Sequence, residues 1–91
     1  MANHRASYRS RIDILASILK TLEKENSEVG LTRLMYNSFI SFKQVKEYLE
    51  VLKGNNLLNY DSKSKKYTIT ANGLKFLELY EKLDNMFHIA E

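Results

Sequence analysis

The stretch Ser41–Lys53 constrains the fold of this chain more than any other segment. Its apolar residues fall three or four positions apart, which places them on one face of a helix: Phe42, Val45, Leu49 and Leu52. Ser41 precedes that pattern and is a good N-cap residue. The opposite face begins with two lysines and an amide. The sequence therefore predicts an amphipathic helix over residues 42–53 whose polar face is available to a partner.

Two further helices are expected on the N-terminal side of this stretch. The first runs from about Tyr8 to Glu25, and its apolar stripe is formed by Ile12, Leu15, Leu19 and Leu22, with Ile18 beside it. Glu28 and Val29 are compatible with a very short strand. Thr32 can cap a short second helix that ends at Tyr36 or Asn37, and Phe39 or Ile40 can fill the angle of the turn that follows.

A hairpin and a last helix follow residue 53. Gly54-Asn55-Asn56 is a strong helix stop. Residues 57–60 and 66–69 read as two strands joined by a polar turn, and Thr70 can cap a helix from Ala71 to about Ile89. The order α-α-α-β-β-α predicts a mainly α winged helix-turn-helix. In it, residues 42–53 are the recognition helix, and the hairpin of residues 57–69 is the wing, with its tip at 61–66.

Composition narrows the possible functions. The chain has 91 residues, enough for one domain, with 44% hydrophobic residues and no cysteine. Disulfides, thiolate metal sites and a cysteine nucleophile are therefore excluded. No apolar run is long enough to span a bilayer, and no secretory signal is evident, so we expect a cytoplasmic protein without a membrane partner. The only histidines are His4 and His88, so we expect no enzyme, metal or cofactor site.

The charge is unevenly distributed along the chain. Residues 1–70 carry twelve Lys or Arg against seven Asp or Glu, whereas residues 71–91 carry two against four. We therefore expect a basic body with a basic N-terminal arm in residues 1–70, and a C-terminal helix in residues 71–91. A basic body suits a polyanionic partner, although small soluble domains are often basic.

Several strings together resemble a known family: Leu31-Thr32-Arg33-Leu34-Met35-Tyr36, Ile40-Ser41-Phe42-Lys43-Gln44, Tyr48-Leu49, and Tyr67-Thr68-Ile69-Thr70-Ala71-Asn72-Gly73 ahead of Phe76-Leu77. They are similar to the archaeal winged-helix family that includes the ten-kilodalton DNA-binding proteins of Sulfolobales and small viral regulators. The resemblance covers about residues 8–83. It implies a homodimer on double-stranded DNA, joined through its last helices. The chromatin members have a long coiled coil there, and the last helix of this chain is shorter. A transcription regulator and a small nucleoid-associated protein are equally open.

Candidate DNA contacts follow from the predicted elements. Lys43, Gln44 and Lys46 would lie in the major groove, where an amide can read adenine and ammonium groups hold phosphates. Glu47 and Glu50 would repel phosphate unless they accept from a cytosine amine or pair with a lysine. The remaining candidates would reach the DNA backbone or minor groove: Arg33, Ser41, the wing residues Lys63, Lys65 and Lys66, and the arm residues Arg5 and Arg9. The alternative for the lysines and the amide of residues 42–53 is a solvated helix face. For the wing lysines it is an ordinary solubilising turn, and for the arm arginines it is the start of a helix.

The last helix has more apolar surface than one small domain needs. Leu74 and Leu77 are expected to face the domain. A second stripe follows 3-4 spacing and predicts a dimer interface: Phe76, Leu79, Leu83, Met86 and Ala90, widened by Tyr80 and Phe87. The alternative is that this stripe folds back onto its own domain. A protein-docking module that does not bind DNA remains the alternative to a DNA-binding function.

Overall fold

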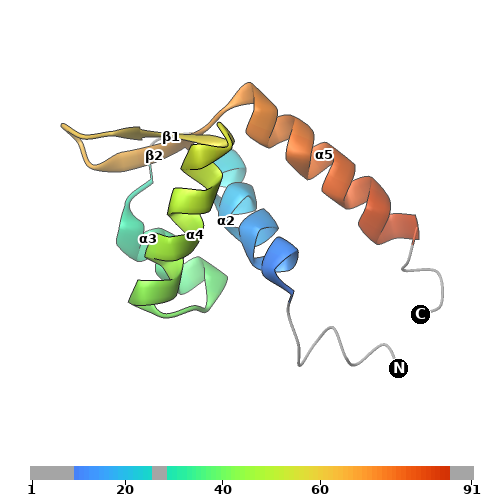
Figure 1. Cartoon of the computed structure of the whole chain (residues 1–91), viewed down its shortest axis with the longest axis horizontal. Helices are drawn as coiled ribbons and strands as arrows, with labels where there is room; N and C mark the ends of the chain where they lie inside the picture. Colours follow the sequence, from blue (N-terminus) through green and yellow to red (C-terminus); the bar gives the residue numbers. More distant parts are fainter. Residues whose placement is uncertain (1–9, 26–28, 87–91) are drawn as a thin grey trace.

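The computed structural model describes residues 10–25 and 29–86, and these form four helices and one two-stranded sheet. In chain order the elements are α2 (Arg11–Glu25), α3 (Leu31–Ser38), α4 (Phe42–Gly54), β1 (Leu58–Asp61), β2 (Lys66–Ile69) and α5 (Ala71–Met86). This is the order predicted for a winged helix-turn-helix, with α4 as the recognition helix and the β1–β2 hairpin as the wing (Figure 1). The fold class is therefore confirmed.

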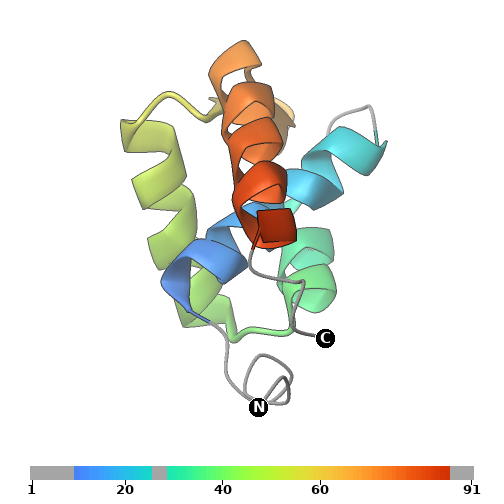
Figure 2. The same cartoon turned by 90° about the vertical axis from the view of Figure 1, so that its right-hand side faces the viewer.

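Helix α2 is the centre of the domain. It packs against α3, α5 and β2. Figure 2 shows α2 crossing behind α5, with α4 on one side of α5 and α3 on the other. The core is built around it from Ile14, Ala16, Ile18, Leu19, Leu22, Val29, Leu34, Val45, Leu49, Leu52, Leu58 and Leu77. Ile12, predicted to face inward, is 50% exposed. Because α2 is covered from several sides, its buried face is wider than the predicted stripe and displaced from it.

The first two described helices begin in different ways. The Oγ of Ser10 accepts from the backbone N–H of Asp13, and the Asp13 carboxylate accepts from the N–H of Ser10, so this pair caps α2. The predicted start at Tyr8 lies outside the described residues. Helix α3 begins at Leu31, with Gly30 at the N-cap position. Thr32 is therefore in the first turn of α3, and the prediction that it caps the helix is wrong.

The turn between α3 and α4 is made by Phe39 and Ile40. Phe39 adopts the left-handed conformation at φ 57°, and its N–H donates to Tyr36 O at 3.3 Å. The next N–H, that of Ile40, reaches back to Met35 O at 3.5 Å. This C-capping geometry turns Phe39 outward, to 86% exposure, and directs Ile40 toward the core. Of the two residues predicted to fill the turn, only Ile40 does so.

The wing is an antiparallel pair in which Leu58 lies opposite Ile69 and Asp61 opposite Lys66. Asp61 shapes the tip, because its carboxylate accepts from the Lys63 N–H at 3.1 Å and from the Ser64 hydroxyl at 3.0 Å. At the other edge of β2, Val29 and Tyr67 exchange backbone hydrogen bonds of 3.0 and 2.8 Å. The wing is thereby tied to the segment that leads into α3. Val29 forms the short bridge expected from the sequence, while Glu28 lies outside the described residues.

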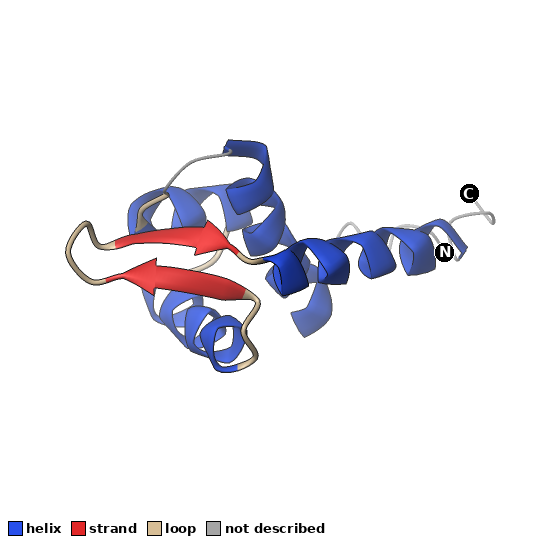
Figure 3. Cartoon of the chain, turned by 90° about the horizontal axis from the view of Figure 1, so that it is seen from above, coloured by secondary structure: helices blue, strands red, loops and turns tan. Residues whose placement is uncertain are grey.

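Helix α5 leaves the wing at Thr70 and extends away from the body, so its far end and the wing tip lie at opposite ends of the molecule (Figures 1 and 3). Thr70 is the predicted cap, and its hydroxyl oxygen accepts from the Gly73 N–H at 2.9 Å. Leu77 is buried as expected, but Leu74 is 44% exposed. The prediction that Leu74 faces the domain is therefore only partly correct. No helix in the described residues is both long and apolar enough to cross a membrane.

Candidate nucleic-acid interface

The exposed surface of α4 has three lengthwise parts. The wing-side edge consists of Phe42, Lys46 and Lys53, which recur at helical spacing. The α2-side edge consists of Gln44, Tyr48 and Val51. The outer ridge between the two edges consists of Lys43, Glu47 and Glu50. The Nζ of Lys53 lies 5.9 Å from the Tyr60 ring centroid in β1, whereas the Arg11 guanidinium of α2 lies 5.8 Å from the Tyr48 ring centroid. These contacts establish which edge of α4 faces the wing.

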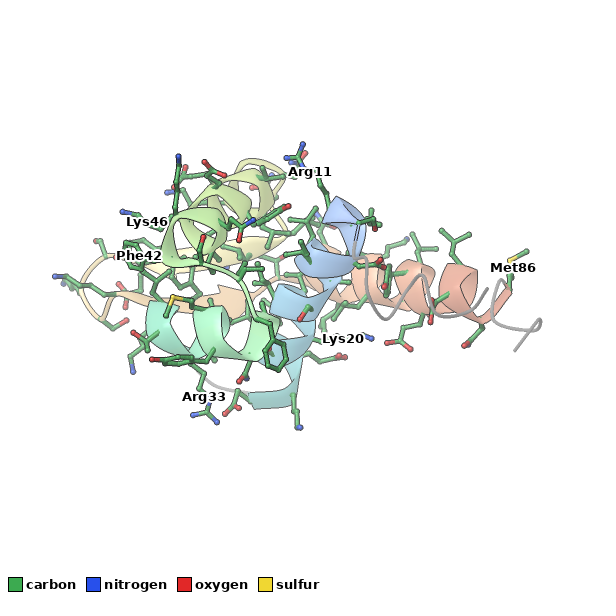
Figure 4. The ribbon with its side chains drawn as sticks, turned by 90° about the horizontal axis from the view of Figure 1, so that it is seen from below. Arg11, Lys20, Arg33, Phe42, Lys46 and Met86 are labelled. Atoms are coloured by element: carbon green, nitrogen blue, oxygen red, sulfur yellow. The ribbon has the colours of Figure 1, made fainter. Side chains whose placement is uncertain are left out.

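Phe42 and Lys46 form the N-terminal part of the wing-side edge, and Figure 4 labels both side chains. The Nζ of Lys46 lies 5.2 Å from the Phe42 ring centroid. Phe42 was predicted to be part of the core, yet it is 54% exposed. Phe42 is the first residue of α4 and does not belong to the core cluster, which begins on this helix with Val45. A cation and an aromatic ring are thus both accessible where a recognition helix begins.

Ser41 and Gln44 form a reciprocal cap at the start of α4. The Ser41 Oγ accepts from the Gln44 N–H at 3.1 Å, and the Gln44 Oε1 accepts from the Ser41 N–H at 3.1 Å. One lone pair of the Gln44 amide oxygen is therefore used by the cap, and the side chain lies on the α2-side edge. The signal was present in the sequence as Ser-x-x-Gln, a capping-box pattern. The Ser41 cap was predicted from the sequence, whereas the reciprocal bond from Ser41 N–H to Gln44 was not.

The lysines of the wing divide into two groups. Lys63 and Lys65 are exposed at the tip, and Lys65 adopts a left-handed conformation at φ 59°. Lys66 begins β2, and its Cδ would lie 3.9 Å from a Cβ placed on Gly30. The Lys66 side chain therefore runs along the start of α3 rather than out from the tip. Lys63 and Lys65 are the cations that the tip presents.

Arg33 lies apart from this surface. Its Nη2 lies 2.8 Å from the Glu25 Oε2, and it points away from the side that carries Phe42 and Lys46 (Figure 4). The structure thus places Lys43 and Lys46 on neighbouring turns of α4, and it leaves Arg33 elsewhere. Arg5 and Arg9 lie outside the described residues.

Acidic and aromatic groups lie between α4 and the wing. The Glu50 carboxylate lies 4.0 Å from the Lys53 Nζ. Tyr60 and Tyr67 pack across the hairpin with ring centroids 4.7 Å apart. Burial raises the pKa of Tyr67 above its ordinary value, and the nearby Tyr60 and Glu50 raise it further. Tyr67 therefore keeps its proton at neutral pH. The outer ridge is mixed in charge, so the cationic character of the surface comes from its wing-side edge and from the wing tip.

The residues predicted for a dimer interface divide into two sets. Phe76 and Tyr80 are half-buried against their own core, stack at a centroid distance of 6.4 Å, and are held by a hydrogen bond from the Tyr80 hydroxyl to Asp13. Leu79, Leu83 and Met86 are 51%, 56% and 65% exposed at helical spacing. We call these three residues the α5 stripe. Phe87 and Ala90 lie outside the described residues. Within residues 10–25 and 29–86, no group of three or more metal-ligating side chains is present.

A family model described as winged helix-turn-helix matches residues 8–88, which is most of the chain. The match includes α4 and the wing as well as α5. No curated protein is similar enough in sequence to match the chain.

The reciprocal cap predicts separate effects of two substitutions at Gln44. Gln44→Ala removes the bond to the Ser41 N–H, so we expect the free energy of unfolding to fall by about 0.5–1 kcal/mol. Gln44→Glu keeps an acceptor at the same place and adds a negative charge near the helix N-terminus, so we expect stability to be retained or raised. Urea unfolding followed by circular dichroism measures both. Equal stability of all three proteins would show that the cap contributes nothing in solution.

Proposed function

Because the chain belongs to the winged helix-turn-helix family, we propose that it binds double-stranded DNA, with α4 in the major groove and the wing on the adjacent backbone or minor groove. In this proposal it acts in the cytoplasm as a homodimer, either as a transcription regulator or as a small nucleoid-associated protein. Lys43 and Lys46 hold phosphates beside the groove, and Lys63 and Lys65 hold the backbone beyond it.

The observation that carries this proposal is that the wing-side edge of α4 and the wing lie next to each other on one side of the domain. Lys53 of α4 reaches Tyr60 of the wing, and Lys46 lies on the same edge of α4 as Lys53. A helix fits the major groove, which is about 12 Å wide, and a flanking hairpin then meets the neighbouring phosphates. Two elements that are distant in sequence thus offer cations to one polyanion.

The α5 stripe supports the homodimer. Leu79, Leu83 and Met86 are more than half exposed on a helix whose other face already packs on the domain through Leu77 and Tyr80. Exposed large apolar residues in a row are uncommon on monomers. A two-fold pairing of this stripe with its own copy would cover it, and would bring two recognition helices to one duplex.

A protein-docking module is the second candidate. The observation in its favour is Phe39, which is 86% exposed and held at φ 57°, a conformation that is costly for a residue other than glycine. Tyr36 is also exposed, at 68%. These aromatic residues belong to α3 and the turn after it. A docking function would use them and would not require the lysines of the wing.

Salt dependence tests the DNA-binding proposal. If Lys43, Lys46, Lys63 and Lys65 each neutralise one phosphate per protomer, the slope of log K against log salt is about −7 for a dimer. Lys65→Ala removes one contact per protomer and reduces the magnitude of the slope by about 2. Lys24→Ala is the matched control, because Lys24 is an exposed lysine in the last turn of α2, outside α4 and the wing. Fluorescence anisotropy on a random-sequence duplex measures the slopes. Absence of duplex binding at low salt contradicts the proposal and favours docking.

Light scattering tests the homodimer. A chain of 10.7 kDa gives a dimer of about 21 kDa. Leu83→Glu places a carboxylate within the paired stripe, which costs several kcal/mol, so we expect the mass to halve while the helical circular dichroism is retained. Leu74→Glu is the matched control: it makes the same change on the same helix, at a residue 44% exposed outside the α5 stripe, and should leave the dimer intact. A native protein that stays monomeric at tens of micromolar contradicts this assembly.

A further inference from the structure

Phe42 is an aromatic side chain exposed at the end of α4 that would enter a groove first. It is the first residue of the helix, it is 54% exposed, and it lies on the wing-side edge. In helix-turn-helix proteins, the N-terminal residues of the recognition helix are those that contact base edges. Solvent exposure at this position is costly for a phenyl ring, because its apolar surface stays in water. A base-edge contact would remove that surface from water.

Gln44 is poorly placed to be the main base reader. A bidentate contact with adenine needs the amide oxygen and the amide nitrogen together. The oxygen of Gln44 accepts from the Ser41 N–H, so turning the amide away from the cap toward a base would break that bond and weaken the cap of α4. Gln44 also lies on the α2-side edge, away from the wing. The wing-side edge therefore offers a different kind of contact, through an apolar ring and the ammonium group above it.

The position of Lys46 complements the ring. Its Nζ lies 5.2 Å from the Phe42 ring centroid and is held there by a cation–π attraction, which is weak at a solvent-exposed site. This attraction is weak enough for a phosphate to draw the ammonium group away. Once Lys46 is on the backbone, one face of the Phe42 ring is open to the floor of the groove. The pair can thus deliver one charged and one apolar contact from adjacent turns of α4.

We propose that Phe42 contacts the C5-methyl group of thymine in the major groove, and that this surface therefore selects duplex DNA by its C5-methyl groups. The inference deepens the proposed function and rests on it. The C5-methyl is the apolar group that a natural base pair presents in the major groove, and apolar side chains, phenylalanine included, are its usual partners. 5-Methylcytosine carries a methyl group at the same ring position, so it belongs to the same class of ligand.

Competition between two duplex pools tests this contact without knowledge of a preferred site. Both pools have the same random sequences, but one contains thymine and the other 2′-deoxyuridine, which lacks the methyl group. Burial of one methyl group corresponds to about fourfold in affinity, so the native protein should prefer the thymine pool by about that factor per protomer. A pool in which 5-methylcytosine replaces cytosine should bind the native protein more tightly than the unmodified thymine pool.

Substitutions assign the preference to a residue. Phe42→Ala should bring the thymine-to-uracil ratio close to one, while Phe42→Leu, which keeps an apolar side chain and guards against a folding defect, should retain part of it. Phe39→Ala is the matched control, because Phe39 is a more exposed phenylalanine, at 86%, in the turn outside α4. It should leave the ratio unchanged. Circular dichroism verifies that each variant is folded.

The outcomes separate this inference from the proposed function. Native protein that binds both pools equally well overturns the methyl contact and leaves DNA binding intact. A thymine preference that persists in folded Phe42→Ala overturns the assignment to Phe42. Weaker binding of Phe42→Ala to both pools alike indicates ring insertion or backbone contact, and also overturns it. Failure of the native protein to bind any duplex overturns the proposed function itself.

Discussion

The hydrogen bonds of Thr70 are the constraint on which the arrangement of both surfaces depends. Its N–H donates to Leu57 O at 3.2 Å, its hydroxyl donates to Asn56 O at 2.7 Å, and the same oxygen accepts from the Gly73 N–H. The end of α4, both ends of the wing and the start of α5 are thus joined at one point. A Cβ on Gly73 would lie 2.2 Å from Leu57 O, so glycine is required for this close approach. This junction holds the wing beside α4.

One consequence of this junction is that two candidate surfaces point to opposite ends of the molecule. The wing-side edge of α4 and the wing tip lie on one side, and α5 carries its exposed stripe away from them (Figure 3). Assembly through the stripe would therefore leave the DNA-facing surface free. Dimerisation would raise the affinity for DNA by joining two copies of the DNA-facing surface, without a change in the structure of either copy. The buried Leu77 and the hydrogen bond from the Tyr80 hydroxyl to Asp13 hold α5 on α2, and so fix the relation of the two surfaces.

The sequence predicted the order of elements because local signals define them. The helix caps and stops are short-range features, at Ser41, Thr70 and Gly54-Asn55-Asn56. The spacing of Val45, Leu49 and Leu52 identifies the buried face of α4.

The exposure of individual side chains was harder to predict. Phe42 follows the same spacing as the core residues, but its position at the helix end leaves it half in water. The prediction that Phe39 fills the turn was wrong because its orientation depends on a left-handed backbone conformation, and phenylalanine rarely adopts that conformation. The Arg33 side chain forms an ion pair with Glu25 of α2, and the spacing of residues in the sequence does not reveal such a contact between two helices. Dimer and DNA contacts remain predictions.

The central claim is that α4 and the wing bind one duplex together, and a nuclear magnetic resonance titration of ¹⁵N-labelled protein with duplex DNA tests it most directly. The account predicts that the backbone amides of residues 42–46 and 62–66 shift together as duplex is added. Amides on the outer face of α3, such as those of Thr32 and Tyr36, should stay in place. Shifts confined to α3 and the turn at Phe39, or no shift in α4 and the wing at saturating duplex, would contradict the account.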